Sequence, residues 1–515
     1  MTASPLPAVA LVGAGPGHPG LITLRGVELL RQADFVLYDR LVAPGLLDHV
    51  PPSARRMCVE ELAPCHVDRQ PLIEQTMIDM ARQGRRVVRL KGGDPMIFGR
   101  AGEEAQALRQ AGIPFEIVPG ISAALGASAC AAIPLTHRRF ASAVAIVTGH
   151  EQPDKPGSLL DWEALARFPG TLVFYMAIAR LEAFVRQLLD QGKAATTPAA
   201  LVERASTAQQ RTWTTTLGEL PALARSEGAT APALVIVGDV VPLRDEIAWF
   251  ESRPLFGRTV VITRPRHQAE GMVQRIEELG GQARLLPVVD IRPPADWGPV
   301  DDVLSRLAQF DWVVFTSSNG VESFLGRLRH QGRDLRALGG VKLAAIGPAT
   351  AEALRKYHLE ADLVPATFNS EGLAAALRPH VAGCRVLLAR ANRGLDLLRE
   401  ELAPVATVEQ VAVYDQVDTL PDEAAALVHD LSAGAVDYVC LTSSNIALGF
   451  ARLLDAAARR AIEVGRVGLV SISPRTSEAI RGVGLPVAGE ASEYTTAGVV
   501  DALVRLAAVG VSAGP

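Results

Sequence analysis

The sequence has little cysteine and lacks long apolar runs. Its five cysteines form no CxxC pair and no regular framework, so we expect reduced thiols and no metal site rather than disulfides or bound zinc. No apolar stretch approaches the roughly 18 residues of a membrane span. Residues 1–7 also lack a basic segment followed by an apolar one. We therefore expect no membrane anchor, no signal peptide and a cytoplasmic protein.

The sequence is short of lysine as well, and its overall charge is mildly acidic. Lysine occupies only five positions, so nearly all basic residues are arginine, and the net charge is −5. A GC-rich genome would explain the excess of arginine, although guanidinium groups also form bidentate pairs with carboxylates that lysine cannot form. The acidic balance disfavours a nucleic-acid-binding protein, which typically has a basic surface.

The length and the pattern of apolar segments predict several α/β domains. The chain has 515 residues, of which 49% are hydrophobic and 21% charged, as is typical of globular proteins with more than one core. Short apolar segments alternate with amphipathic ones on both sides of an irregular stretch at 249–257, where Pro254 and Gly257 indicate a linker. We therefore expect two α/β domains, covering residues 1–252 and 253–515.

The second half contains an internal repeat. The segment 311–319, which ends in Thr-Ser-Ser-Asn, recurs at 437–445, an offset of 126 residues (437 − 311), and 345–354 recurs at 471–480. A period of this length indicates a duplicated domain rather than a solenoid, so we expect two similar α/β lobes.

Each copy of the repeat has hydroxyl groups directly after an apolar segment, in Thr316–Asn319 and Thr442–Asn445. At the carboxyl end of a strand these groups would lie where ligands of open α/β sheets bind. Free backbone N–H groups of a helix starting there would favour anions. The alternative is that these residues only cap helices. Both interpretations stay open.

The first half begins with a glycine-rich motif at Gly15–Gly20, which has the pattern Gly-x-Gly-x-x-Gly. With Asp39 at about the expected distance, it formally matches the dinucleotide-binding fingerprint, so a nucleotide-dependent oxidoreductase is one hypothesis. Pro16 and Pro19 count against it, because they remove N–H groups and fix φ where a pyrophosphate loop must curl.

Four further motifs in the first half form a specific set, Tyr38-Asp-Arg-Leu-Val, Arg89-Leu-Lys-Gly-Gly-Asp-Pro, Val118-Pro-Gly-Ile-Ser-Ala-Ala and Ile133-Pro-Leu-Thr-His-Arg. Together with the glycine-rich motif, they resemble the tetrapyrrole methylase family, most closely its uroporphyrinogen-III C-methyltransferase branch, over residues 8 to about 250. The resemblance implies a two-lobed α/β fold with S-adenosylmethionine held between the lobes. The residues implied to contact this methyl donor are Pro16, Gly92, Gly93, Asp94, Ile97, Ser122, Ala123, Met176 and Ala205.

The same resemblance implies a reaction, the methylation of uroporphyrinogen III at two ring positions to give precorrin-2. A pyrrole carbon attacks the sulfonium methyl group, so the protein mainly has to align the reactants. Asp39 matches the acidic residue of the family and is the expected base for the pyrrole protons. The alternative is that Asp39 is a surface turn carboxylate paired with Arg40.

Several positions depart from the family pattern. His18 stands where the family usually has aspartate, Glu61 where a lysine is usual, Cys130 where a tyrosine is usual and Ala205 where a glycine is usual. His66 remains at the family spacing. These departures give an alternative in which the synthase described next is active and the methylase is degenerate or altered in specificity.

The segment from about 257 to 507 resembles uroporphyrinogen-III synthase. The matching pieces are Val260-Val-Ile-Thr-Arg-Pro-Arg, Phe315-Thr-Ser-Ser-Asn-Gly-Val, Ala345-Ile-Gly-Pro-Ala-Thr, Val413-Tyr-Asp, Leu441-Thr-Ser-Ser-Asn and Tyr494-Thr-Thr-Ala-Gly. The fold of this family has two lobes joined by two crossing segments. It implies one lobe of about 257–293 plus 418–507 and another of about 294–417.

This second resemblance implies cyclisation of hydroxymethylbilane to uroporphyrinogen III with inversion of the last ring. The enzyme has to make inverted closure faster than spontaneous direct closure, so it needs carboxylate anchors more than a strong acid or base. Tyr414 stands where the family has a tyrosine that assists departure of the hydroxyl group, and the alternative is a half-buried core residue. The expected substrate contacts are Arg264, Thr316, Ser317, Ser318, Thr350, Thr442, Ser443 and Thr476.

Together the two resemblances predict a bifunctional enzyme, both a methyltransferase and a lyase, acting on small-molecule tetrapyrroles toward sirohaem or cobalamin. The first implies a homodimer through the methylase half. We expect no nucleic-acid or membrane partner. The competing hypotheses are the oxidoreductase and a non-catalytic protein that binds a small acid between two lobes, which would leave the motifs of the first half unexplained.

Overall fold

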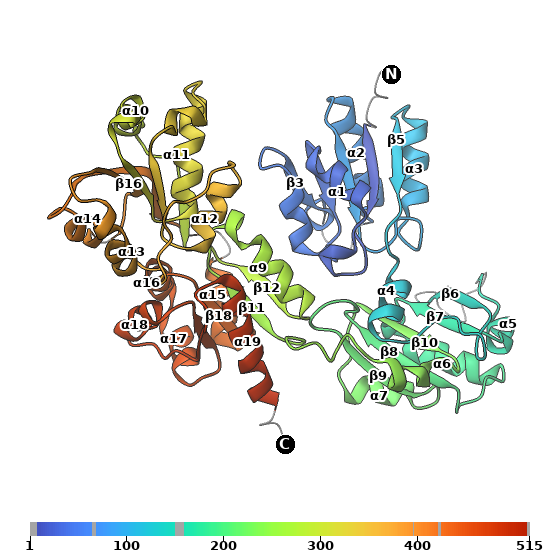
Figure 1. Cartoon of the computed structure of the whole chain (residues 1–515). Coiled ribbons are helices and arrows are strands. Elements are labelled where there is room, and N and C mark those ends of the chain that lie inside the picture. The colour runs from blue at the N-terminus through green and yellow to red at the C-terminus, as the bar shows by residue number, and fades with distance from the viewer. Residues whose placement is uncertain (1–7, 64–67, 150–158, 395, 421–423, 512–515) are drawn as a thin grey trace. The chain divides into compact units, whose positions relative to one another are not determined.

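The computed structural model describes residues 8–63, 68–149, 159–394, 396–420 and 424–511 (Figure 1). The chain folds into two compact units. The first unit comprises Met1–Gly257 with Leu279–Gln282, and the second comprises Arg258–Glu278 with Ala283–Pro515. Across the described ranges, no helix has both the length and the hydrophobicity needed to span a bilayer.

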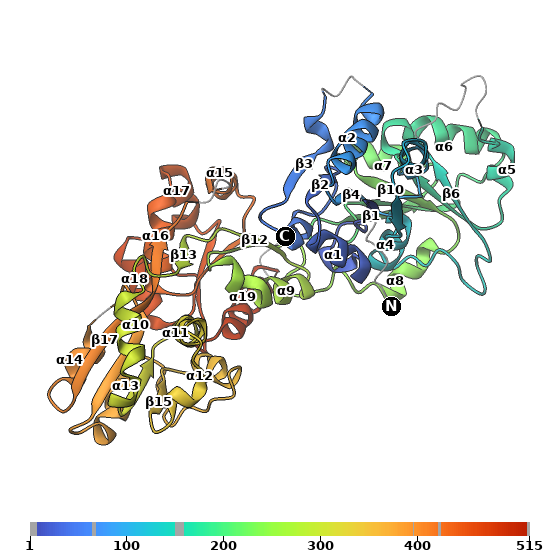
Figure 2. The ribbon, with the colours of Figure 1, turned by 90° about the horizontal axis from the view of Figure 1, so that it is seen from above.

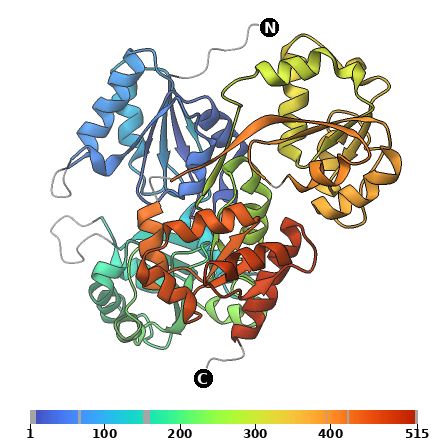
Figure 3. The same ribbon diagram turned by 90° about the vertical axis from the view of Figure 1, so that its left-hand side faces the viewer.

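The first lobe of the first unit is a parallel five-stranded sheet in the order β3-β2-β4-β1-β5. Its strands are β1 (Val9–Gly13), β2 (Phe35–Tyr38), β3 (Arg55–Cys58), β4 (Val87–Lys91) and β5 (Phe115–Val118). Its α-helices are α1 (Leu24–Arg31), α2 (Gln70–Arg82) and α3 (Ala101–Gln110). Figure 3 shows helices on both sides of this sheet, which is drawn in blue.

Two cores, one on each face, explain why the strands of this sheet are almost continuously apolar. Val9 and Leu11 pack with α2 and α3, whereas Ala10 and Val12 pack with α1 on the opposite face. Successive side chains of a strand point to opposite faces, so a sheet covered on both sides needs apolar residues at every position. The structure thus confirms the predicted α/β class.

The second lobe of the first unit is a mixed sheet in the order β6-β7-β10-β8-β9, in which β6 and β7 are parallel and the other pairs antiparallel. Its strands are β6 (Val144–Thr148), β7 (Thr171–Tyr175), β8 (Pro198–Glu203), β9 (Arg211–Thr216) and β10 (Ala233–Val237). Its α-helices are α4 (Ala123–Cys130), α5 (Trp162–Arg167), α6 (Leu181–Asp190), α7 (Leu220–Ser226) and α8 (Arg244–Ile247). α4 packs on one face of this sheet through its alanines.

The second unit also has two lobes, each with a five-stranded sheet. The first sheet, in the order β12-β11-β18-β19-β20, is formed by β11 (Thr259–Ile262), β12 (Gln282–Leu285), β18 (Tyr438–Leu441), β19 (Gly468–Ser471) and β20 (Gly489–Glu490). The second, in the order β13-β17-β16-β14-β15, is formed by β13 (Val289–Arg292), β14 (Trp312–Phe315), β15 (Lys342–Ala345), β16 (Arg385–Ala391) and β17 (Thr407–Asp418). β13 runs antiparallel to β17 at the edge of this second sheet.

The helices of the second unit divide between these two sheets. Those with the first sheet are α9 (Arg266–Glu278), α15 (Ala424–Ala433), α16 (Ser444–Leu453), α17 (Ala456–Glu463), α18 (Pro474–Gly482) and α19 (Thr496–Val511). Those with the second are α10 (Gly298–Ser305), α11 (Ser318–His330), α12 (Pro348–Arg355), α13 (Ser370–Leu377) and α14 (Leu397–Leu402). α9 and α19 lie side by side although they are far apart in the sequence (Figures 1 and 2).

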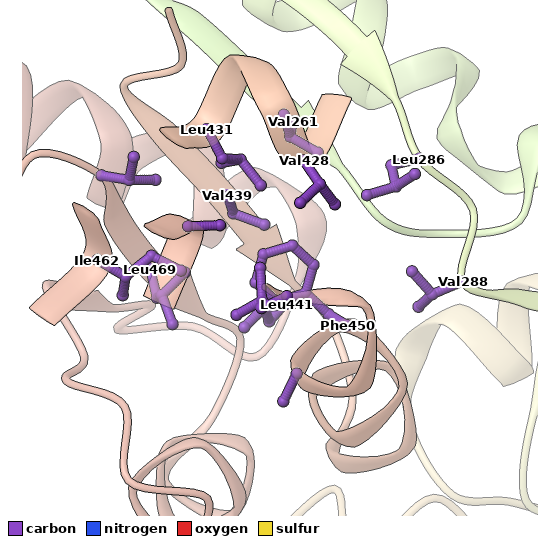
Figure 4. Close-up of a cluster of buried hydrophobic side chains, with 14 of the residues drawn as sticks. Val261, Leu286, Val288, Val428, Leu431, Val439, Leu441, Phe450, Ile462 and Leu469 are labelled. Carbon is purple, nitrogen blue, oxygen red and sulfur yellow. The ribbon is translucent and has the colours of Figure 1, made fainter. Parts of the chain in front are cut away.

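The core of the first sheet of the second unit brings together both ends of this unit. Val261 of β11 packs with Val439 and Leu441 of β18 and with Phe450 of α16 (Figure 4). These four side chains are at most 1% exposed. A segment near residue 260 is therefore held to segments near residue 440 by burial of apolar surface.

The two copies of the internal repeat fold alike, as predicted. The repeated aspartate precedes β14 or β18, and its Oδ2 accepts a hydrogen bond from the first N–H of a neighbouring strand. Asp311 accepts from Arg385 (2.7 Å) and Asp437 accepts from Thr259 (2.8 Å). Arg385 and Thr259 are themselves 126 residues apart (385 − 259), so the repeat extends to β16 and β11.

This wider repeat shows how the lobes of the second unit are built. β11 opens the first copy and β16 opens the second, yet β11 pairs with β18 of the second copy and β16 pairs with β14 of the first. Each lobe therefore combines the opening part of one copy with the closing part of the other.

Candidate active sites

Three glycines bring the strand-end loops of the first lobe of the first unit into backbone contact. Gly15 and Gly93 exchange hydrogen bonds, Gly15 N to Gly93 O at 3.2 Å and Gly93 N to Gly15 O at 2.8 Å. A Cβ atom on Gly120 would lie 2.2 Å from Gly93 O, which no side chain tolerates. The N–H of Gly15 is thus used within the protein, so this loop is not an open cradle for a pyrophosphate.

Side chains from two of these loops then fix the site further. Asp94 Oδ2 accepts from Gly120 N (3.0 Å), and Asp94 Oδ1 accepts from Met96 N (2.8 Å). The hydroxyls of Ser122 and Tyr175 lie 2.5 Å apart, and Tyr175 also accepts from Ala124 N at 2.7 Å. Burial raises the pKa of Tyr175, so the phenol stays neutral and can donate. Tyr175 was not predicted as a site residue.

Backbone strain concentrates in the same region. Phe98 (φ 54°), Met176 (φ 54°), Arg204 (φ 47°) and Ser206 (φ 65°) all have left-handed backbone conformations without being glycine. Such conformations cost about 1–3 kcal/mol each and cluster at ligand sites. Phe98 and Met176 also leave 43% and 48% of their surface exposed, as does Ile97 with 38%.

The remaining predicted donor contacts lie against these loops. Pro16 faces α4, since a Cβ on Gly126 would lie 2.5 Å from the Pro16 ring. A Cβ on Gly17 would lie 3.1 Å from the carbonyl oxygen of Ala205. Gly93 approaches Ala123, whose N would lie 3.5 Å from an added Cβ. The predicted residues on the 15–18, 92–97, 122–123 and 205 segments are therefore neighbours in space.

His18, one of the departures from the family pattern, caps a short 3-10 helix, Pro19–Leu21. Its Nδ1 accepts from Gly20 N at 3.0 Å, which is the task an aspartate would perform at a helix N-cap. Burial lowers the pKa of His18, and the nearby Arg253 lowers it further. The neutral ring that this acceptor role needs is therefore favoured.

The other departures have structural tasks as well. Glu61 Oε1 accepts from Cys58 N (2.6 Å) and caps the 3-10 helix Val59–Glu61. Cys130 is buried at the end of α4, and burial raises the pKa of its thiol to about 11. His66 lies outside the described residues.

Asp39 is held by a buried charge network and not by Arg40. Arg89 donates to Asp39 Oδ1 at 2.5 Å, and Gly92 N donates to Oδ2 at 3.3 Å. Arg89 also donates to Glu104, which accepts from Lys91 at 2.7 Å. Arg40 pairs instead with Glu60. The expected pairing of Asp39 with Arg40 is therefore wrong, because Asp39 pairs with Arg89.

Sequence reasoning also passed over Arg100, which begins α3 with φ at 59°. Its guanidinium binds Glu103 through two hydrogen bonds of 3.0 and 2.7 Å and lies 3.4 Å from Asp68. An exposed, oriented guanidinium next to the 92–98 loop is suited to a carboxylate ligand. Its position in the Gly-Arg-Ala-Gly-Glu-Glu segment after Phe98 was the available signal.

In the second unit, the Thr-Ser-Ser-Asn motifs do cap helices. Ser317 Oγ accepts from Gly320 N (3.0 Å) and Ser443 Oγ accepts from Ile446 N (3.2 Å), each as the N-cap of the helix that follows. The flanking Thr316, Ser318 and Thr442 are partly exposed at the strand ends. The capping interpretation is correct for the two serines, and it leaves their neighbours free to meet a ligand.

Thr350 and Thr476 are far less accessible. They are 4% and 1% exposed, and Thr476 Oγ1 lies 3.1 Å from Ser473 Oγ. Ser473 caps α18 by accepting from Thr476 N. Both threonines therefore contribute first to the starts of α12 and α18.

Tyr414 lies in the core with its hydroxyl beside a Thr-Ser-Ser-Asn motif. It is 3% exposed and belongs to the core of the second sheet, yet its hydroxyl lies 3.0 Å from Ser317 Oγ. Burial raises the pKa of Tyr414, so its phenol is neutral and able to donate at neutral pH. The side chains of Asn319 and Gln416 also form hydrogen bonds with this hydroxyl.

Arg264 and a residue missed by sequence reasoning, Arg390, occupy equivalent places. Arg264 follows β11 in the first copy of the repeat. Arg390 lies near the end of β16 in the second copy, 126 residues later (390 − 264). Burial lowers the pKa of the Arg264 guanidinium, whose Nη2 lies 3.3 Å from Gln268. Arg390 is 8% exposed and lies 3.2 Å from Gln410. The repeat offset of 126 residues, added to Arg264, predicts Arg390 as its equivalent.

The two lobes of the second unit touch through amides beside these groups. Gln268 Nε2 donates to Asn319 Oδ1 at 2.6 Å, and Asn445 Nδ2 donates to Gln416 Oε1 at 3.2 Å. Asn319 and Asn445 are the equivalent last residues of the two Thr-Ser-Ser-Asn motifs. Within the described part of the chain, no cluster of three or more His, Cys, Asp or Glu side chains is arranged to hold a metal ion.

Comparison with known proteins divides the chain in the same way. The family of Tetrapyrrole (Corrin/Porphyrin) Methylases matches residues 8–221, and that of Uroporphyrinogen-III synthase HemD matches residues 270–501. The porphyrin biosynthesis protein HemD of Ruminiclostridium josui is 33% identical over 476 residues, which cover 92% of this chain and 93% of that protein. Siroheme synthase 1 of Yersinia pseudotuberculosis is 51% identical over 246 residues, which cover 48% of this chain and only 51% of that protein.

Solved structures resemble each half separately. The uroporphyrin-III-C-methyltransferase of Thermus thermophilus is 41% identical, covering 47% of this chain and 96% of that one with a TM-score of 0.39. A mutant uroporphyrinogen III synthase of the same species is 21% identical, covering 48% of this chain and 98% of that one with a TM-score of 0.38. From the match along nearly its whole length, the chain belongs to the family of two-domain tetrapyrrole-biosynthesis enzymes in which a tetrapyrrole methylase is followed by a uroporphyrinogen-III synthase.

Proposed function

We propose that the chain carries out two successive reactions. The second unit cyclises hydroxymethylbilane to uroporphyrinogen III with inversion of the last ring, and the first unit methylates that product twice to give precorrin-2. The observation that carries this proposal is the presence of both family matches on one chain, which aligns with a relative over 92% of its own length and 93% of the relative's. The product would lead toward sirohaem or cobalamin.

The methyl donor is S-adenosylmethionine, which supplies an electrophilic methyl group on a sulfonium centre. The proposed donor residues are those named from the sequence, Pro16, Gly92, Gly93, Asp94, Ile97, Ser122, Ala123, Met176 and Ala205. The fit rests on three observations: glycines that leave backbone atoms uncovered, exposed apolar side chains at Ile97 and Met176, and strained backbone at Met176 and Ser206. Asp94 supports the site through its bonds to backbone N–H groups.

Asp39 is the proposed base for the pyrrole protons. Its two oxygens are oriented by Arg89 and by Gly92 N, and its side chain remains 30% exposed, which leaves it accessible to a substrate. The bond from the buried Arg89 fixes the orientation of the Asp39 carboxylate, as a base that has to meet a pyrrole proton requires. Arg100 is proposed to anchor a substrate carboxylate, in exchange for its solvent-exposed pairs with Glu103 and Asp68.

In the second unit, we assign substrate binding to the partly exposed hydroxyls and to two guanidinium groups. Thr316, Ser318 and Thr442 offer donors at strand ends, and Arg264 with its repeat equivalent Arg390 offers positive charge. Ser317, Thr350, Ser443 and Thr476 complete the proposed set by fixing the helix starts. Tyr414 is proposed to donate to the departing hydroxyl group, since burial keeps its phenol protonated.

The alternative, a degenerate methylase, predicts that the departures from the family pattern damage the site. One of them, His18, instead preserves the capping hydrogen bond that an aspartate would accept from Gly20. This observation favours an active methylase.

We also propose that the chain forms a homodimer through its first unit. β6 is an edge strand, and its Val144 and Ile146 are each 38% exposed, with Phe140 nearby in sequence at 40%. An apolar row on an edge strand is a surface that natural proteins usually cover. Ile146→Asp should convert the dimer to a monomer in light scattering, whereas Val464→Asp, at an exposed site of the second unit, should not.

The test of both activities is incubation of the purified chain with hydroxymethylbilane, with and without S-adenosylmethionine, followed by separation of products by mass and isomer. Type III uroporphyrinogen without the donor and a doubly methylated product with it would support the proposal. Unmethylated type III product in both reactions would leave only the synthase. Type I isomer alone would contradict the synthase assignment.

A further inference from the structure

A series of hydrogen bonds joins the linker after the second sheet to the first donor loop. Glu251 lies in the 249–257 stretch, and its Oε1 accepts from Gln210 Nε2 at 2.9 Å. Gln210 Oε1 accepts from Ser206 N at 2.9 Å, and Ser206 Oγ accepts from His18 N at 3.2 Å. Gln210 and Ser206 are 3% and 0% exposed, so water does not compete freely for these bonds.

The carboxylate of Glu251 sets the direction of the series. Three donors converge on it: Gln210 and Thr212 at Oε1, the latter at 2.7 Å, and Arg244 at Oε2. Because a carboxylate only accepts, the amide of Gln210 turns its NH2 group toward Glu251, and the same NH2 group also donates to the carbonyl oxygen of Cys130 at 3.2 Å. Its oxygen is then left for the N–H of Ser206.

Ser206 is a residue that needs such a restraint. Its φ of 65° is unfavourable for a serine, so the turn holds this conformation only while its neighbours fix it. Gly17 packs directly against the turn, since an added Cβ would lie 3.1 Å from Ser206 Oγ and 2.8 Å from Thr207 Cγ2. A relaxed turn would therefore shift the peptide between Gly17 and His18.

We propose that Gln210 and Glu251 are positioning residues of the methylase, which hold the 204–207 turn and, through it, the 16–18 loop in the conformation that binds the methyl donor. Neither residue needs to touch the donor. Glu251 lies beyond residue 221, where the methylase family match ends, so the stretch that looks like a linker is a working part of the methylase. This inference rests on the proposed donor site.

Glu251→Gln tests the donor-to-acceptor direction of these hydrogen bonds, because the substitution hardly changes the volume of the side chain. A glutamine has one oxygen, which the charged Arg244 will take, so its NH2 group faces the NH2 group of Gln210. A flip of the Gln210 amide relieves this conflict and also breaks its hydrogen bond to Cys130 O. The N–H of Ser206 then meets an NH2 group and loses its acceptor. We expect the Kd for S-adenosylhomocysteine, measured by calorimetry on the full chain, to rise by about five- to tenfold, as for one lost buried hydrogen bond.

A matched control uses the same substitution at another glutamate that accepts a hydrogen bond from β9. Glu227 accepts from Trp213 Nε1 at 3.1 Å beside β9 but belongs to no part of the series. Glu227→Gln removes the same charge, and its Kd should equal that of the unchanged chain. The methyl-transfer kcat should change less than twofold in Glu251→Gln, while the KM for the donor rises with Kd.

A double variant distinguishes loss of the hydrogen bond that positions the 204–207 turn from a general loss of stability. In Gln210→Glu with Glu251→Gln, the new carboxylate at 210 accepts from both Ser206 N and the amide at 251, which restores the acceptor. We expect this double variant to bind S-adenosylhomocysteine more tightly than Glu251→Gln, by threefold or more.

The outcomes are distinct. If the unchanged chain does not bind S-adenosylhomocysteine, the donor site itself is wrong, and this inference fails with it. If the unchanged chain and Glu227→Gln bind while Glu251→Gln binds equally well, the donor site stands and the positioning role is refuted. A weaker Kd in Glu251→Gln that the double variant does not restore, accompanied by a lower melting temperature, would also overturn it.

Discussion

Glu104 provides the sharpest test of the charge network that holds Asp39. Its side chain is 0% exposed, and one oxygen accepts from Lys91 (2.7 Å) and Arg89 (3.2 Å), whose side chains are each 3% exposed. Glu104→Gln would leave the buried Lys91 without its ion-pair partner and Arg89 with Asp39 alone. Breaking a buried pair in this way costs about 3–5 kcal/mol, which exceeds a quarter of the stability of most domains.

The neighbouring residue supplies the control. Glu103 also pairs with an arginine, Arg100, but the two side chains are 52% and 47% exposed. Solvent screens such a pair, so Glu103→Gln should leave the stability of this lobe nearly unchanged. Both variants lose one negative charge at adjacent positions of α3, and only burial distinguishes them.

Raising the pH should partly rescue Glu104→Gln. Burial and the nearby Arg89 already hold the pKa of Lys91 below its usual value, and loss of Glu104 lowers this pKa further. Between that folded-state pKa and about 10.4, the unfolded chain binds a proton that the folded chain does not. Stability of the variant therefore rises with pH across this window.

Hydrogen exchange read by mass spectrometry can follow the first unit alone, through peptides that cover β1 and β4. At an m-value of about 2 kcal/mol/M, a loss of 4 kcal/mol moves the urea midpoint of these peptides by about 2 M. The unchanged chain and Glu103→Gln should nearly coincide. If Glu104→Gln lies within 1 kcal/mol of Glu103→Gln at pH 7, the network does not stabilise this lobe and the reasoning fails.

Three further predictions concern single residues of the two sites. His18→Ala should weaken S-adenosylhomocysteine binding by about fivefold through loss of an N-cap worth about 1 kcal/mol, whereas His18→Asp should retain binding. Since the folded-state pKa of His18 lies below 6.5, calorimetry should show constant affinity above about pH 6.5 and a decline below it, which His18→Asp should lack. Gly120→Ala should abolish donor binding, because its Cβ would overlap the carbonyl oxygen of Gly93, and normal affinity would contradict the backbone contact. Tyr414→Phe should slow type III formation about tenfold or more with little loss in melting temperature, and an unchanged rate would assign Tyr414 to the core.

The sequence predicted the features that depend on local patterns or on repetition. Alternating apolar segments indicated α/β lobes, and the repeated Asp311 and Asp437 motifs indicated two similar lobes in the second unit. Both expectations were met because strand burial and helix capping act over a few residues. The pairing of β11 with β18 and of β16 with β14 was implied by the resemblance to the synthase family and by no local pattern, because pairing across more than seventy residues leaves no local signature.

The partners of the site residues were harder to predict. The pairing of Asp39 with Arg89, of Ser122 with Tyr175 and the bond of Gln210 to Glu251 join positions 41 to 53 residues apart. A polar side chain can find many partners at such a distance, and only the packed structure selects one. For Asp39 the adjacent Arg40 was the natural local choice, yet the sheet places Arg89 closer.

The duplication in the second unit distinguishes structural features that both copies share from a hydroxyl group that occurs in one copy. Features present in both copies at the same offset include the aspartates before β14 and β18 and the capping Ser317 and Ser443, which bond to backbone N–H groups. Tyr414 breaks this equivalence by adding a hydroxyl beside Ser317. A substrate whose last ring must be inverted has to be held differently at its two ends, and two identical lobes could not do so. The reaction should therefore depend on the asymmetric residue more than on the duplicated ones.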